Sequence, residues 1–121
     1  MVASPIPRFD SVTIDCPEPS ALATFYASLL EWPIPEASDD YMTIEPPGGG
    51  TAITFQRIPD FVAPTWPNPP VAQQMHLDLS VEDMERAHER AIALGARHLD
   101  TRETFRVYAD PVGHPFCICT W

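Results

Sequence analysis

The sequence predicts an α+β fold in which one unit of strand, helix and further strands is used twice. First, the hydrophobic pattern of residues 9–58 returns in the same order in residues 74–121. Second, a proline-rich segment, residues 59–73, separates these halves near the midpoint of the 121 residues. Third, when the two halves are aligned with a single offset of 65 residues, Ser11 aligns with His76, Ile14 with Leu79, Glu18 with Asp83 and Leu29 with Leu94.

The first half opens with a strand and a helix. Residues 9–16 alternate, with Val12, Ile14 and Cys16 on one face, which is typical of a half-buried strand. Pro19 suits the first helical position, with Glu18 as the cap, and Pro33 ends the helix. Apolar residues follow at helical spacing: Leu22, Phe25, Tyr26, Leu29 and Leu30.

Two strands complete the first half, at residues 41–45 and 51–58. Between them, residues 46–50 contain three consecutive glycines, which supply the positive φ values that a turn needs. No Lys-Ser/Thr pair follows these glycines, so they do not indicate a phosphate-binding loop.

The second half repeats the order. Residues 74–80 alternate as a strand, Asp83 caps a helix, and Gly95 ends that helix. Three further strands are predicted, at residues 97–99, 104–108 and 116–121.

The charge balance excludes several partners. Asp and Glu outnumber Lys and Arg by 17 to 7, which gives a formal charge of −10 and argues against nucleic acid or an anionic membrane. No segment approaches 18 consecutive apolar residues and no signal peptide is evident, so a cytoplasmic protein is expected. The three cysteines form neither a disulfide framework nor a zinc motif, and we expect free thiols.

Several segments together resemble glyoxalase-like domains of the vicinal oxygen chelate superfamily (glyoxalase, bleomycin resistance and extradiol dioxygenase proteins). They are residues 12–21, 25–27, 30–32, 76–83, 93–96 and 109–116. The resemblance covers almost the whole chain. It implies one domain, residues 1–121, whose paired βαβββ modules (9–58 and 74–121) form a curved mixed sheet around a central cleft, with the helices outside and residues 59–73 as linker.

The resemblance also implies four inward positions that hold a divalent metal in the catalytic members. Here those positions are Ser11, Thr54, His76 and Cys117, and only His76 is a usual ligand. Two hydroxyls, one imidazole and one thiol leave the set at least one ligand short. We therefore expect no metal cofactor and assign no catalytic residue.

Alternation places a group of mostly polar side chains on the strand faces that point away from the helices. His76 and Asp78 lie two residues apart on one strand, with Cβ atoms roughly 7 Å apart, so we expect them to grip a ligand rather than contact each other. The alternative is a structural histidine beside a solvated aspartate. Trp66 could close over the cleft as a lid, or pack the linker onto the body. The candidate ligand-binding residues are Ser11, Thr13, Thr54, Gln56, His76, Asp78, Cys117 and Trp66.

Three functions follow as hypotheses. The first is a small-molecule-binding protein with a degenerate metal site, whose ligand is a cationic or aromatic metabolite or drug. The second is a lyase, isomerase or dioxygenase that uses a metal with unusual ligands, or proton transfer by His76 and Asp78. The third is a structural or dimerisation module, since members of the family it resembles often pair. A homodimer is expected in each case.

Overall fold

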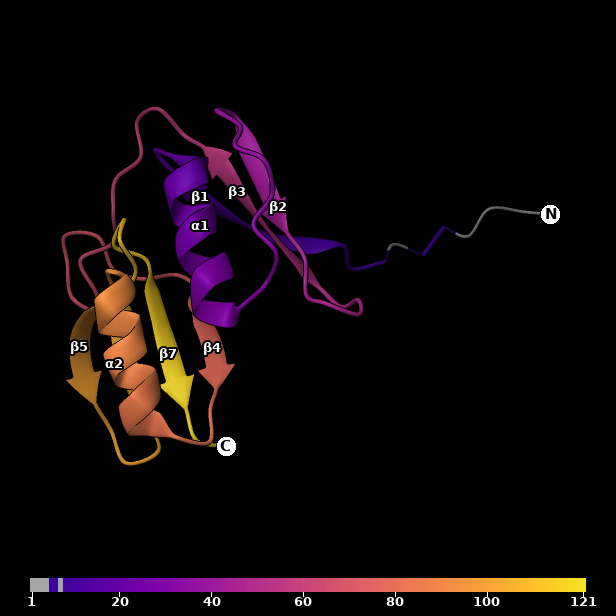
Figure 1. The fold of residues 1–121 in the computed structure, drawn as a ribbon. Coiled ribbons are helices and arrows are strands. Elements are labelled where there is room, and N and C mark those ends of the chain that lie inside the picture. Colours follow the sequence, from indigo (N-terminus) through magenta and orange to yellow (C-terminus); the bar gives the residue numbers. More distant parts are fainter. Residues whose placement is uncertain (1–4, 7) are drawn as a thin grey trace.

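The structure is a computed structural model that describes residues 5, 6 and 8–121, and it contains two helices and two mixed sheets (Figure 1). The first half holds β1 (Ser11–Cys16), α1 (Pro19–Leu30), β2 (Tyr41–Ile44) and β3 (Ala52–Arg57). The second half holds β4 (Leu77–Ser80), α2 (Met84–Leu94), β5 (Arg97–Thr101), β6 (Phe105–Ala109) and β7 (Pro115–Cys119). The α+β prediction is confirmed.

The first sheet has the strand order β1-β3-β2, with β1 parallel and β2 antiparallel to β3. Helix α1 starts at Pro19 as predicted, but the Glu18 side chain makes no capping hydrogen bond. The helix ends at Leu30, before Pro33, because Glu31 takes a left-handed conformation with a φ of 57°. The Trp32 backbone N–H then donates to the Ala27 carbonyl at 2.8 Å.

The second sheet has the order β4-β7-β6-β5, again with a parallel pair at one edge. Asp83 caps α2 as predicted, because its side chain accepts a hydrogen bond from the Arg86 backbone N–H at 3.2 Å. Gly95 ends the helix with a φ of 115°, which a residue with a side chain rarely adopts.

The first described sheet lacks a counterpart of β5. The equivalent segment lies 65 residues earlier, at 32–36, and it contains Pro33 and Pro35. Neither proline has a backbone N–H. Because the two prolines are two residues apart, an extended segment loses two hydrogen-bond donors along the same edge, which is the edge that would pair with a neighbouring strand. This segment therefore does not pair as a strand of the first sheet.

One hydrophobic cluster contains residues of both halves. Tyr26 of α1 stacks on Phe55 of β3, with ring centroids 5.7 Å apart, and meets the edge of Phe116 of β7 at 6.0 Å. Arg90 of α2 donates hydrogen bonds to the Ser28 and Leu29 carbonyls at the end of α1, at 2.7 and 2.8 Å. The two helices therefore meet, and each covers its own sheet (Figure 1).

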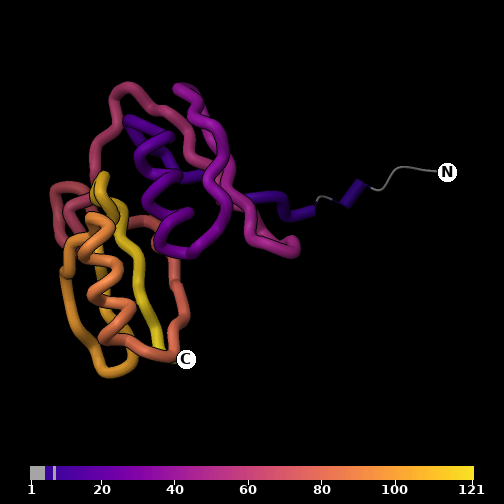
Figure 2. The backbone as a smooth tube through the Cα atoms, viewed as in Figure 1, coloured from indigo at the N-terminus to yellow at the C-terminus, as the bar shows by residue number. Residues whose placement is uncertain are grey.

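The linker, residues 59–73, leaves β3 and arcs to the side of the second sheet (Figure 2). Thr65 closes a loop within it: its backbone N–H donates to the Val71 carbonyl at 2.5 Å, and its hydroxyl accepts from the Val71 N–H at 3.1 Å. Across the described part of the chain, neither helix has the length and apolar character needed to cross a membrane.

Candidate ligand-binding site

A cavity of about 320 Å³ lies between the two halves, and we call it the inter-module pocket. Its lining comes from β1, α1, the end of the linker, the start of β4 and the β6–β7 turn. The lining residues are Val12, Thr13, Ile14, Asp15, Tyr26, Pro64, Val71, Ala72, Gln74, Met75, His76, Leu77, His114 and Pro115.

The pocket exists because β1 and β4 are each the edge strand of a separate sheet. Two hydrogen bonds join the halves beside it. The His114 imidazole donates from Nε2 to the Asp15 carbonyl at 2.6 Å, and the Tyr26 hydroxyl donates to the Asp110 carboxylate at 2.7 Å. The walls are mainly apolar, and the polar groups belong to a few side chains, which is the usual composition of a small-molecule site.

Asp110 fixes the β6–β7 turn behind this pocket. It is 3% exposed, and its carboxylate accepts the Tyr26 hydroxyl and the backbone N–H groups of Val112 and His114, the last two at 3.0 Å. Burial raises the pKa of the Asp110 carboxyl, against the opposing effect of these hydrogen bonds. Sequence reasoning assigned no role to Asp110.

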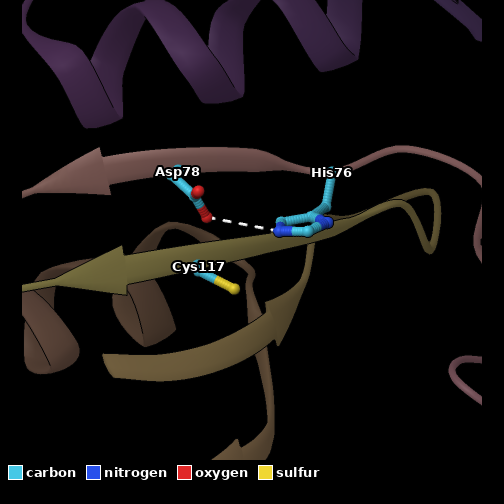
Figure 3. A group of neighbouring side chains, drawn as sticks. All are labelled: His76, Asp78 and Cys117. Carbon is cyan, nitrogen blue, oxygen red and sulfur yellow. Dashed lines mark ion pairs between the residues drawn. The ribbon is translucent and has the colours of Figure 1, made fainter. Parts of the chain in front are cut away.

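His76, Asp78 and Cys117 converge at the start of the parallel pair of β4 and β7 (Figure 3). Their nearest ligand atoms lie within 4.8 Å of one another, and His76 Nε2 lies 3.3 Å from Asp78 Oδ1. The expectation that His76 and Asp78 do not contact each other is therefore wrong. The rise along a strand sets the distance between the two Cβ atoms but not between the ends of the side chains. His76 lies just before β4, where its ring can turn toward the Asp78 carboxylate.

Cys117 is 6% exposed, and burial is the main cause that raises the pKa of its thiol from 9.0 to about 11; the Asp78 carboxylate adds to the effect. The thiol is therefore protonated at neutral pH and is a poor nucleophile. A metal bound there would have to displace this proton.

The inner face of the second sheet is apolar at β6 and β7, contrary to the prediction of a polar face. Val107, Cys117 and Cys119 form a buried cluster there, and the linker residue Trp66 packs against it. Trp66 thus packs onto the body of the protein, the second of the two predicted alternatives. The three cysteines are free and buried.

Three of the four remaining candidate residues, Thr13, Thr54 and Gln56, line one or both of two hollows. Thr13 lines both the inter-module pocket and a second hollow of about 550 Å³, where it meets Thr54 and Gln56. Ser11 lines neither of these two hollows. Thr54 also shares a hydrogen bond of 2.9 Å with the hydroxyl of Thr43 on β2.

Several pocket residues were missed. Val71 lines the pocket from the end of the linker, where the sequence shows no periodicity that would assign it a partner. Met75 lies in the segment just before β4 and also lines the pocket. The sequence alone gives His114 no partner, which is typical of a structural or solvated histidine. Its hydrogen bond to Asp15 gives it a structural partner, and it also lines the pocket. A histidine within a turn that joins two strands was the available signal.

The family model of the glyoxalase-like domain matches residues 11–119 of the chain. No curated protein matches the chain. Among solved structures, the chain is similar to a glyoxalase-related enzyme from Fulvimarina pelagi, with a TM-score of 0.71 and 17% identity over 96% of this chain and 89% of that one.

A second similar structure is a glyoxalase/bleomycin resistance protein/dioxygenase family enzyme from Burkholderia phytofirmans PsJN. Its TM-score is 0.72 at 18% identity, with coverage of 93% of this chain and 97% of that chain. A protein from Agrobacterium tumefaciens, solved by NMR, has a TM-score of 0.73 at 18% identity, covering 96% and 98%. At sequence identities this low, the similarity to these structures shows a shared fold and nothing about activity.

Proposed function

The chain belongs to the glyoxalase-like domain family, within the vicinal oxygen chelate superfamily, and on this premise we propose that it binds a small molecule in its inter-module pocket. The observation that carries the proposal is the pocket itself. Its 320 Å³ suits a compact organic molecule, its walls are mainly apolar, and Thr13, Asp15 and His76 supply polar contacts.

The ligand is cationic or aromatic. Among the described residues that line the pocket, none is Lys or Arg, and Asp15 is the one carboxylate. The whole chain carries a formal charge of −10, which attracts cations and repels anions. Tyr26, His76 and His114 add aromatic rings on which a flat molecule can stack.

The metal site of the superfamily is degenerate in this chain. The positions that resemble the metal ligands hold Ser11, Thr54, His76 and Cys117, of which two are hydroxyls and one is a thiol with a pKa of about 11. Asp78 adds one carboxylate beside His76. The cluster of possible metal ligands therefore holds two usual ligands, His76 and Asp78, and the protonated thiol of Cys117. Small-molecule binding therefore proceeds without a metal.

A pair of probes with one ring system and opposite charges tests the proposal. N-methylacridinium is expected to bind and to raise the melting temperature, because a ligand of the native state stabilises it by mass action. Acridine-9-carboxylate is expected to bind more weakly. His76→Ala should weaken the cation's binding, whereas His98→Ala, outside the pocket, should leave it unchanged. Failure of every probe to bind would contradict the proposal.

An enzyme is the second candidate, and the contact between His76 and Asp78 at 3.3 Å favours it. A carboxylate beside an imidazole is an arrangement used for proton transfer, and the same cluster with Cys117 offers three possible metal ligands. It would act as a lyase, isomerase or dioxygenase. Stoichiometric metal that is lost in His76→Ala would favour this candidate over the metal-free binder.

The assembly is a homodimer in this proposal. Exposed large apolar side chains outside the pocket, among them Tyr41 and Ile34 of the first half, support an interaction with a second copy. Sedimentation equilibrium across a hundredfold range of concentration tests it, and a mass that stays at one chain would contradict it.

A further inference from the structure

Three side chains that line the inter-module pocket, His76, His114 and Tyr26, each have a proton engaged by a neighbouring acceptor, and this influences which ligands fit. The His114 ring nitrogen Nε2 lies 2.6 Å from the carbonyl oxygen of Asp15. A carbonyl oxygen only accepts hydrogen bonds, so Nε2 carries the proton. In the neutral imidazole the other nitrogen, Nδ1, then has a lone pair and accepts.

The same argument applies to His76. Its Nε2 lies 3.3 Å from the Asp78 carboxylate, and the negative charge favours the tautomer with its proton on this nitrogen. The second ring nitrogen points away from Asp78 (Figure 3). It is left with a lone pair in the neutral ring.

Two further pocket residues follow the pattern. The hydroxyl proton of Tyr26, which forms part of the pocket wall, is donated to the buried carboxylate of Asp110 at 2.7 Å. Asp15 lines the pocket with an exposed carboxylate, which is an acceptor when ionised. Thr13 and Gln74 can donate or accept, so they do not discriminate between the two kinds of ligand.

We infer that the inter-module pocket selects compact aromatic molecules that donate a hydrogen bond, such as a ring N–H, an amine or a phenol, over shape-matched molecules that only accept. The inference rests on the proposed binding function and specifies its ligand. Positive charge is not required, because a neutral N–H satisfies the same acceptors. A ligand that only accepts hydrogen bonds cannot pair with the acceptor atoms of His76, His114 and Asp15. It also places its own lone pairs beside theirs, which is unfavourable.

Indole and benzofuran test this inference, because the two bicyclic rings match in size and differ in one group, an N–H against an oxygen. Dissociation constants are measured by ligand-observed NMR titration at pH 8. Wild-type protein is expected to bind indole about fivefold more tightly, which corresponds to one hydrogen bond.

The double variant Asp15→Leu/His76→Phe removes two acceptors and should bring the ratio close to one while benzofuran still binds. Both residues are exposed, and thermal unfolding checks that the variant is folded. His98→Phe makes the same His-to-Phe change on β5, outside the pocket, and should keep the fivefold ratio.

Equal affinities in the wild type, or tighter binding of benzofuran, would overturn the inference and leave pocket binding intact. An unchanged ratio in the double variant would overturn it too. If neither ring binds, the proposed pocket function fails together with this inference.

Discussion

Raising the pH from 8 to 10 is expected to destabilise the native state through two buried thiols. Burial is the main cause that raises the pKa of both Cys16 and Cys117 from 9.0 to about 11. The folded state therefore holds these protons more tightly than the unfolded state. Their stabilising contribution is complete below pH 9 and is lost as the pH rises toward 11.

The size of the effect follows from these two values. For one thiol with pKa values of 9 unfolded and about 11 folded, linkage gives a loss of roughly 1 kcal/mol between pH 8 and pH 10. Cys16 and Cys117 together account for roughly 2–3 kcal/mol. Burial also raises the pKa of Cys119 and Tyr108, which titrate in both the wild type and the variants and cancel in the comparison.

Urea unfolding at pH 8, 9 and 10 measures this loss in the wild type and in Cys16→Ala/Cys117→Ala. The double variant starts from a lower free energy of unfolding, since both side chains are buried. Its loss of free energy of unfolding between pH 8 and 10 should nevertheless be smaller than the wild type's by roughly 2–3 kcal/mol. Equal losses in the two proteins would refute the assignment of raised pKa values to these thiols.

Three further substitutions test the contacts that hold the pocket and the second module together. Tyr26→Phe removes the hydroxyl that donates to Asp110, and urea unfolding should show a loss of about 1.5–3 kcal/mol; no loss would contradict this bond. Gly113→Ala places a Cβ 2.8 Å from the Cβ of the linker residue Ala63, at a φ of 101°. Urea unfolding should show a loss of about 1–3 kcal/mol in the free energy of unfolding. An unchanged free energy would contradict the packing of the linker against Gly113. Asp83→Ala removes the cap of α2 and should lower the free energy of unfolding by about 1 kcal/mol, measured in the same way; an unchanged value would argue against the cap.

Local sequence signals predicted most of the fold because they depend on neighbouring residues. Pro19 at the start of α1, Asp83 at the cap of α2 and Gly95 at its end each act within one helical turn. The offset of 65 identified the repeat, since both halves must bury one face of a strand and one of a helix. The early end of α1 was missed because the left-handed Glu31 is not a residue type that predicts a stop.

The site was harder to predict because its contacts join distant parts of the chain. His114 and Asp15 are 99 residues apart, and no local pattern couples them. Trp66 covers Cys117 and Cys119 because the linker folds back over the second sheet, a path that its prolines do not specify. Thr13 and His76, two of the predicted residues, line one pocket, but alternation alone does not explain this, since Val12 and Ile14 of the opposite face of β1 line it too.

Metal-free binding of an organic molecule by this glyoxalase-like chain can be tested by native mass spectrometry of protein purified without chelators or a metal-affinity tag. One spectrum reports subunit number, bound metal and retained small molecules. A metal-free dimer that carries an organic adduct is the predicted result. A stoichiometric divalent ion, lost in His76→Ala, would contradict the claim and favour a metal-dependent enzyme.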